Sequence, residues 1–228
     1  MDHNVLTRPV LDFHCHTLIS DGELGPAELG RRAFVNGYKV LGLADHVDHS
    51  TLEHTLTSAL IAVRALTHFG VSILAGVELT HVPPDQIEDL VVWSRELGAQ
   101  FVVVHGESPV EPVAPGTNLA AIEAGADILA HPGFLTREEA ALAKKRGVFL
   151  ELTARGGHSL TNGYVAKLAL EEGVNLLVNS DCHDIGDILT PEKQRLVALG
   201  AGLSQEQYVA MMERAGSWAE YKLKDGLE

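Results

Sequence analysis

The chain has 228 residues, of which 46% are hydrophobic, and a formal net charge of −14. This length and composition predict a single globular domain over residues 1–228. The negative charge argues against long nucleic acids as partners, because nucleic-acid affinity comes mainly from Lys and Arg side chains that neutralise phosphates. No apolar run is long enough to span a bilayer, and residues 1–8 lack the features of a signal peptide. We therefore expect a cytoplasmic protein with no membrane partner, whose oligomeric state the sequence leaves open.

Short apolar runs alternate with helix-like segments along the chain. The predicted strands are residues 10–14, 39–44, 71–76, 101–105, 127–131, 148–153 and 174–179. The predicted helices between them include residues 26–37, 86–98, 137–147 and 164–173, each closed by a glycine, and residues 204–226 form a final helix that Ser204 caps.

The alternation of strand and helix predicts right-handed β-α units around a parallel sheet. The expected fold is α/β, a barrel of the (β/α)8 type with one unit fewer, which is a seven-stranded TIM-like barrel. The main alternative is an open doubly wound sheet. Its usual glycine-rich dinucleotide loop is absent, because "HCHTLISDG" follows the first strand instead.

Side chains able to bind metals stand at the ends of all the predicted strands. They are His14 and His16, Asp45 and His46, Glu78, His105, His131, Glu151, and finally Asp181 and His183. In a closed parallel barrel these ends lie on one rim, where barrel enzymes build their active sites. One histidine at a strand end is usually an ordinary polar group, but a complete set is hard to reach by chance. The set therefore predicts a metal site.

Strand geometry sharpens this prediction. Side chains alternate along a strand, so His14 and His16 should point the same way and Cys15 the opposite way. Cys182 should likewise point away from its neighbours, which leaves nitrogen and oxygen ligands. Such ligands suit Zn, Mn or Fe, and the carboxylates among them favour more than one ion. The remaining histidines are expected to be solvated; they are His3, His49, His54, His68 and His81.

Several motifs resemble those of the PHP (polymerase and histidinol phosphatase) superfamily of metal-dependent phosphoesterases. They are "DFHCHTLISDG", "LADH" at 43–46, "GVE" at 76–78, "VVH" ending at His105, "AHPG" at 130–133 and "SDCH" at 180–183. The resemblance covers most of the chain. It implies a distorted seven-stranded barrel with a trinuclear metal site on its C-terminal rim.

Carried over position by position, the resemblance implies three ion sites. The first takes His14, His16, Glu78 and Asp181, the second shares Glu78 and adds His105 and His131, and the third takes Asp21, His46 and His183. Some relatives have histidine where this chain has Asp21. Asp45 is expected to orient a ligand, and Glu151 to support the ligands in the same way or to contact substrate.

Arg155 is the only Lys or Arg in the loops expected on the rim. It is predicted to contact a substrate phosphate, and members of the family resembled here use a rim arginine in this way. The alternative is a salt bridge with Glu111 or another rim carboxylate. His158 is a second candidate for phosphate contact or proton donation. The loop at 105–117 is either a wall or lid that selects substrate or a rigid connector into a helix capped by Thr117.

These features predict a hydrolase that cleaves a small phosphomonoester with metal-activated hydroxide. Histidinol phosphate is one candidate substrate, with carboxylates such as Glu107 and Glu111 as partners for its amine. The alternative is a nucleotide or short-oligonucleotide phosphoesterase or exonuclease, since the family resembled here includes exonuclease modules. A non-catalytic metal-binding module is the third hypothesis, which the intact ligand set disfavours.

Overall fold

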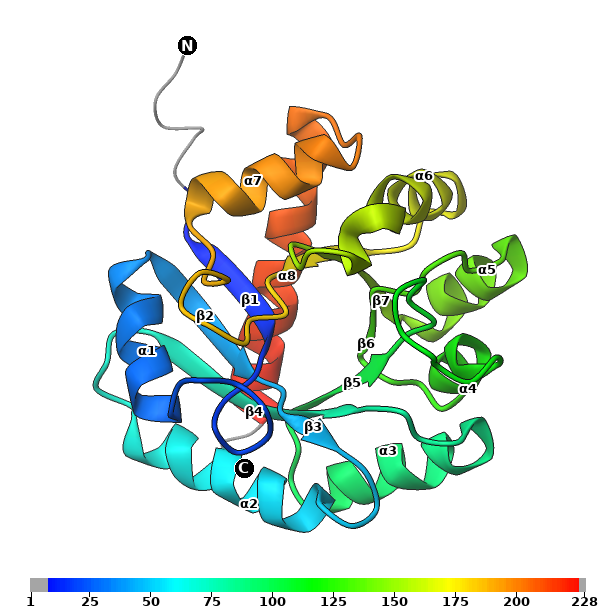
Figure 1. Ribbon diagram of the computed structural model, residues 1–228. Helices are drawn as coiled ribbons and strands as arrows, with labels where there is room; N and C mark the ends of the chain where they lie inside the picture. Colours follow the sequence, from blue (N-terminus) through cyan, green and yellow to red (C-terminus); the bar gives the residue numbers. More distant parts are fainter. Residues whose placement is uncertain (1–7, 226–228) are drawn as a thin grey trace.

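A computed structural model describes residues 8–225, which form a nearly closed barrel of parallel strands (Figure 1). The strands follow the order β1-β2-β4-β5-β6-β7-β8, and a short strand, β3, pairs with β4 alone. Their bounds are β1 Val10–Cys15, β2 Tyr38–Leu43, β3 His46–Val47, β4 Ser72–Leu79, β5 Phe101–His105, β6 Ile128–Ala130, β7 Phe149–Thr153 and β8 Leu176–Asn179. The predicted seven-stranded TIM-like barrel is confirmed.

Helices surround this ring of strands. They are α1 Pro26–Val35, α2 Leu52–Ala65, α3 Ile87–Glu96, α4 Thr117–Glu123, α5 Arg137–Arg146, α6 Asn162–Glu172, α7 Pro191–Gly200 and α8 Gln205–Asp225, with short 3-10 turns η2 Pro84–Gln86 and η3 His158–Thr161. Within the described residues, every helix is too short or too polar to cross a bilayer.

The barrel closes between its first and last strands through side chains as much as through backbone. The backbones of Cys15 and Cys182 form an isolated parallel β-bridge, in which the His16 N–H donates to the Cys182 carbonyl at 2.8 Å. Between the same two strands, the Gln194 amide on α7 donates to the carbonyls of Leu11 on β1 (2.6 Å) and Val178 on β8 (2.9 Å). We call this join between β1 and β8 the seam. This closure rules out the open doubly wound alternative.

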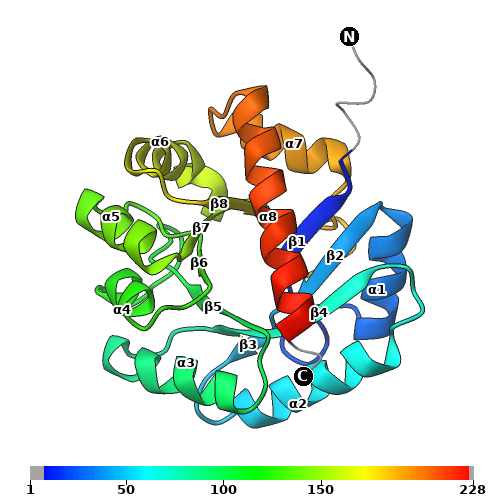
Figure 2. The same cartoon turned by 180° about the vertical axis from the view of Figure 1, so that it is seen from behind.

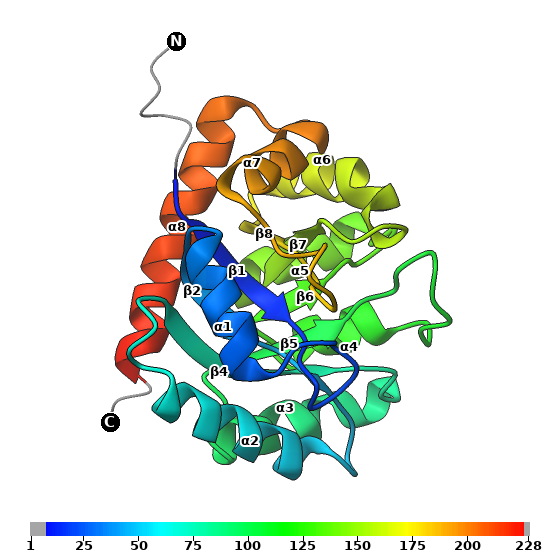
Figure 3. The same cartoon turned by 60° about the vertical axis from the view of Figure 1, so that its left-hand side comes forward.

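Helix α8 crosses the end of the barrel at which the strands begin (Figures 2 and 3). Its Trp218 ring packs near the rings of Phe13, Phe101 and Phe149, with centroids 4.9, 6.3 and 5.3 Å away. These aromatic contacts come from strands on several sides of the barrel, so α8 fills its floor. The opposite end, where the strands finish, remains available for a site.

Local chemistry explains where several helices begin and end. Thr136 and Glu139 form a reciprocal capping box at the start of α5, and Gly147 closes that helix with φ 77°. Ser204 accepts from the Gln207 N–H at 3.2 Å, which confirms the expected cap of α8. The expected Thr117 cap is wrong. Gly116 is the N-cap of α4, and the Thr117 hydroxyl donates back to the Ala114 carbonyl at 2.7 Å.

Candidate metal centre

The strand ends carry the predicted ligands to one rim of the barrel. Most of these residues stand at or just beyond the last residue of a strand, whereas Asp21 comes from the loop after β1. His46 opens β3 and lies opposite Glu78 in the ladder between β3 and β4. The structure thereby brings together all nine residues that the resemblance implied: His14, His16, Asp21, His46, Glu78, His105, His131, Asp181 and His183.

The alternation along β1 is as expected. The rings of His14 and His16 lie side by side, with centroids 5.0 Å apart. Cys15 between them is a buried free thiol that lies 3.5 Å from the Ser180 hydroxyl. Cys182 is also buried, and its thiol donates to the Asp184 carbonyl at 3.3 Å. Both cysteines are thus engaged away from the histidines.

The inner part of the site is a buried group of two histidines and two carboxylates. His14 Nε2 lies 3.2 Å from Glu78 Oε1, and His16 Nε2 lies 3.4 Å from Asp181 Oδ1. Among the described residues, His14 Nε2, both ring nitrogens of His16 and Glu78 Oε1 are buried without a hydrogen-bond partner. Buried polar atoms are nearly always hydrogen-bonded, so this pattern fits a bound cation.

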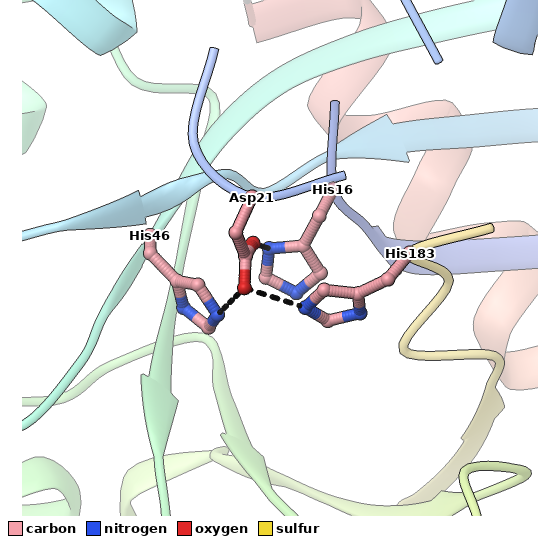
Figure 4. Close-up of side chains that lie close together, drawn as sticks. All are labelled: His16, Asp21, His46 and His183. Atoms are coloured by element: carbon pink, nitrogen blue, oxygen red, sulfur yellow. Dashed lines mark ion pairs between the residues drawn. The ribbon is translucent and has the colours of Figure 1, made fainter. Parts of the chain in front are cut away.

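A second group lies nearer the surface (Figure 4). Asp21 Oδ2 lies 3.5 Å from His46 Nε2 and 3.3 Å from His183 Nε2, and Asp21 Oδ1 lies 3.9 Å from His16 Nδ1. The ligand atoms of these four residues lie within 4.8 Å of one another. His16 belongs to both groups because its two nitrogens face opposite ways.

The backbone is strained where two of these residues follow their strands. His131 after β6 has φ 27°, and Asp181 after β8 has φ 54°. Residues other than glycine rarely adopt positive φ, and where they do the surrounding structure holds them there. The strain turns both side chains toward each other, with His131 Nε2 3.6 Å from Asp181 Oδ2.

Two further carboxylates, Glu151 and Asp45, contact the candidate ligands or the loop that carries one of them. Glu151 Oε2 lies 2.8 Å from His14 Nδ1 and accepts from the Asn179 amide at 2.9 Å. This contact places a proton of His14 on Nδ1 and makes Nε2 the ring nitrogen that faces the site. Glu151 is fully buried and contacts the candidate ligand His14.

Asp45 acts on the loop that carries Asp21. Its carboxylate accepts from the backbone N–H and hydroxyl of Thr17 (2.7 and 2.8 Å) and from those of Ser20 (3.2 and 2.7 Å). These four bonds fix the turn after β1 and so fix Asp21 at its end.

The clustered charges shift the pKa values of the carboxylates. Burial would raise the pKa of Asp181, but His14 and the other histidines around it hold that pKa well below its usual range. Burial would likewise raise the pKa of Glu78, which His14 and His46 instead keep well below its usual value. Both carboxylates are therefore ionised at neutral pH and ready to bind a cation.

The pKa values of the histidines shift up or down according to the groups around each ring. Burial would lower the pKa of His46, but the carboxylates of Glu78 and Asp21 raise it to about 10. Burial lowers the pKa of His16 to about 4. At neutral pH His16 is therefore a neutral donor of lone pairs, whereas a cation that binds His46 must displace a proton.

Arg155 makes the alternative contact that the sequence left open. Its Nη1 lies 3.0 Å from Asp187 Oδ2 and donates to the Asp181 carbonyl at 3.3 Å. The guanidinium is thus paired with a rim carboxylate, although not with Glu111. It stands beside Asp181, a candidate metal ligand, and contact with a phosphate stays a prediction.

Glu111 and His81 join the site, and sequence reasoning missed the second of them. Glu111 Oε2 lies 3.1 Å from His105 Nε2 and 3.3 Å from His81 Nε2, and Oε1 lies 3.3 Å from His158 Nε2. The His81 ring also stacks on His105, with centroids 5.4 Å apart. The hydrogen bond from His105 and the nearby imidazoles lower the pKa of Glu111 to about 2. The loop at 105–117 therefore forms a wall of the site.

The other predictions around the site have mixed outcomes. Glu107 serves the fold, because its carboxylate accepts from the N–H groups of Gly116 and Asn118 at the start of α4. Asp187, the partner of Arg155, was not foreseen. The expected exposure of the remaining histidines is confirmed for His49, His54, His68 and His81, although His81 also contacts Glu111, and His3 lies outside the described residues.

No family model matches the sequence. The chain is 45% identical over 199 residues to the uncharacterized protein MJ1295 of Methanocaldococcus jannaschii, covering 86% of this chain and 91% of that protein. It is 29% identical over 202 residues to a probable phosphatase of Clostridium novyi, covering 76% and 79% of the two chains. It is 26% identical over 219 residues to the DNA polymerase/3'-5' exonuclease PolX of Bacillus subtilis; the match covers 87% of this chain but only 38% of that protein.

Solved structures support the fold alone. The apo structure of the N6-methyl-AMP deaminase from Arabidopsis thaliana superposes with a TM-score of 0.60 at 12% identity, covering 96% of this chain and 95% of that one. The likeness lies in the barrel and says nothing of the reaction.

Proposed function

The chain belongs to the same family as the protein MJ1295 of Methanocaldococcus jannaschii, and we propose that it is a metal-dependent phosphoesterase. The observation that carries the proposal is the set of buried ring nitrogens and carboxylate oxygens without hydrogen-bond partners at the strand ends. The names of two other relatives, a probable phosphatase and a polymerase with exonuclease activity, support phosphate esters as the substrate class. The sequence motifs that resemble the PHP superfamily support the same class.

The ligand types fit two or three divalent cations such as zinc, manganese or iron. The residues that would hold them are His14, His16, Glu78 and Asp181 for one ion, Glu78, His105 and His131 for a second, and Asp21, His46 and His183 for a third. Such ions, when bound, lower the pKa of a water molecule and neutralise charge on a phosphoryl group under attack.

The chain's own residues would prepare the site in defined ways. Glu151 holds the proton of His14 on Nδ1, so that Nε2 stays free to bind. Arg155 would donate hydrogen bonds to the phosphate from the guanidinium N–H groups that Asp187 does not bind. The ion pair with Asp187 would fix the orientation of the guanidinium group. Asp45 would keep the loop with Asp21 in place during turnover.

A small phosphomonoester is the substrate that this rim favours. Arg155 is the only Lys or Arg in the loops that follow the strands between residues 16 and 190, and it is paired with Asp187. Long polyanions need many such cations. Glu111 offers a carboxylate to a cationic group, such as the amine of a substrate that resembles histidinol phosphate.

A nucleotide or short oligonucleotide is the second candidate. It is supported by the likeness to a polymerase with 3'-5' exonuclease activity. A mononucleotide needs no extended basic groove, so one arginine suffices to contact its phosphate.

The test is phosphate release from a panel of histidinol phosphate, sugar phosphates, mononucleotides and a short oligonucleotide, after metal removal and reloading with Zn, Mn or Fe. We expect the double variant H14A/H16A to lose bound metal and about 1,000-fold in kcat/KM, which is about 4 kcal/mol of transition-state stabilisation. The matched control is H54A, which removes an exposed histidine on α2. A double variant as active as H54A would refute the proposal.

A further inference from the structure

A third cluster of imidazoles lies at the rim, and one of its members has no metal role so far. We propose that His158 binds, together with His105 and His131, the cation of that part of the site, and that this nitrogen-rich set selects zinc. The inference rests on the metal binding in the proposed function. It replaces the expectation that His158 donates a proton or contacts phosphate.

Geometry is the first support. One ligand atom from each of the three histidines lies within 4.8 Å of the other two. All three residues are buried, with His158 only 6% exposed although it follows a surface loop. The ring of His131 lies between the others, with centroids 4.4 Å from His105 and 4.3 Å from His158.

The free nitrogens are the second support. His158 Nδ1 and His131 Nδ1 are buried and have no hydrogen-bond partner among the described residues. His105 Nδ1 donates to the Gly106 carbonyl at 3.0 Å, so a cation would bind Nε2 by displacing the proton that Nε2 shares with Glu111 at 3.1 Å. A buried nitrogen without a partner is costly, and a shared cation would satisfy several at once.

The backbone is built to hold His158 in this orientation. Gly157, at φ 87°, turns the chain into η3, which begins at His158 itself. The Asn162 side chain then accepts from the Thr153 N–H at 3.1 Å and donates to the Thr153 carbonyl at 2.8 Å, which ties the far end of η3 to β7. The imidazole therefore sits on a short segment fixed at both ends.

The contact between Glu111 and His158 also supports a ligand role for His158. Its Oε1 lies 3.3 Å from His158 Nε2. A carboxylate there keeps the proton on Nε2 and leaves the Nδ1 lone pair for a cation. Glu111 thus does for His158 what Glu151 does for His14.

The ligand chemistry differs between the parts of the site. Three imidazoles give a ligand set rich in nitrogen, which suits zinc, whereas manganese prefers oxygen ligands. The inner group holds two imidazoles and two carboxylates. Zinc should therefore bind most tightly where His158 contributes.

The test is zinc and manganese binding to the metal-free protein, measured by calorimetry and by metal analysis after dialysis. We expect H158A to lose one equivalent of zinc, or to bind it about 100-fold more weakly, while manganese binding changes less. The matched control H54A removes an exposed histidine on α2 and should keep the wild-type zinc stoichiometry. An H158A protein with wild-type zinc stoichiometry and affinity would overturn the inference.

A measurement on the wild type guards against misfolding of the variant. Anomalous diffraction at the zinc edge should place an ion about 2.0–2.1 Å from a ring nitrogen of His158. An ion held by His105 and His131 but beyond about 3 Å from His158 overturns this inference and leaves the proposed function standing. A wild-type protein that binds no divalent ion contradicts both.

Discussion

Glu151 is fully buried, and its Oε2 contacts His14 Nδ1 and the Asn179 amide. Its negative charge is held by His14 on one side and by the Asn179 amide on the other. A carboxylate in this position raises the basicity of the ligand it touches and fixes the orientation of the ring.

We expect Glu151→Gln to weaken metal binding by about 10- to 100-fold, because a neutral amide no longer favours the proton on His14 Nδ1. Calorimetric titration of the metal-free variant with zinc measures the change. Glu123→Gln, which alters an exposed carboxylate on α4, is the control and should bind as the wild type does. Equal affinities in the two variants would show that Glu151 has no such role.

Among single residues, the sequence predicted those whose side-chain direction follows from their position in a strand. His14 and His16 follow from the alternation of β1. His81 and Glu111 do not, because their contact depends on how two loops after different strands fold over each other. Arg155 was recognised as a rim cation, but its partner Asp187 is 32 residues further along.

Side chains replace part of the backbone ladder in the seam between β1 and β8, where Cys15 and Cys182 form an isolated β-bridge. Gln194 spans it from α7 and bonds a carbonyl on each strand. Its own side chain is fully buried. This amide joins the two strands beside the backbone bond from the His16 N–H to the Cys182 carbonyl, and no strand pattern reveals it.

Removal of this amide should destabilise the fold. We expect Gln194→Ala to lower the free energy of unfolding by about 1–3 kcal/mol, because two buried carbonyls lose their donor. Urea denaturation followed by circular dichroism measures the effect. Leu196→Ala, at a 54% exposed position on the same helix, should change stability by less than about 0.5 kcal/mol. Similar losses in both variants would mean that the seam is held by other contacts.

The elements themselves were predictable because each apolar run is short and bounded by polar or glycine residues. The predicted and observed strands agree closely, from β1 to β8. The short strand β3 and the turn η3 were missed, since two to four residues carry no periodicity. The prediction that Thr117 caps the helix was wrong because Gly116, which has a positive φ, is the N-cap of α4.

The candidate ligands span the chain from residue 14 to residue 183, so only the folded chain brings them together. A ligand that binds the folded state alone raises stability by mass action. Bound cations should therefore stabilise the barrel as well as serve the reaction.

Chelation is expected to lower the Tm by about 5–10 °C relative to protein held at a free zinc concentration about 100 times its Kd. That interval corresponds to about 2.7 kcal/mol for a domain of this size. Differential scanning calorimetry with and without chelator measures it, and the H14A/H16A variant should show a much smaller shift. A chelator effect of the same size in that variant would place the stabilising ions elsewhere.

The join between the first and last strands also fixes when the site can exist during biosynthesis. His16 leaves the ribosome early, but the Cys182 carbonyl that binds its N–H emerges 166 residues later, about 10 to 30 s at ordinary elongation rates. Throughout that interval the early histidines have no barrel around them. Metal loading of the proposed centre would therefore be a late event, which follows translation of nearly the entire barrel.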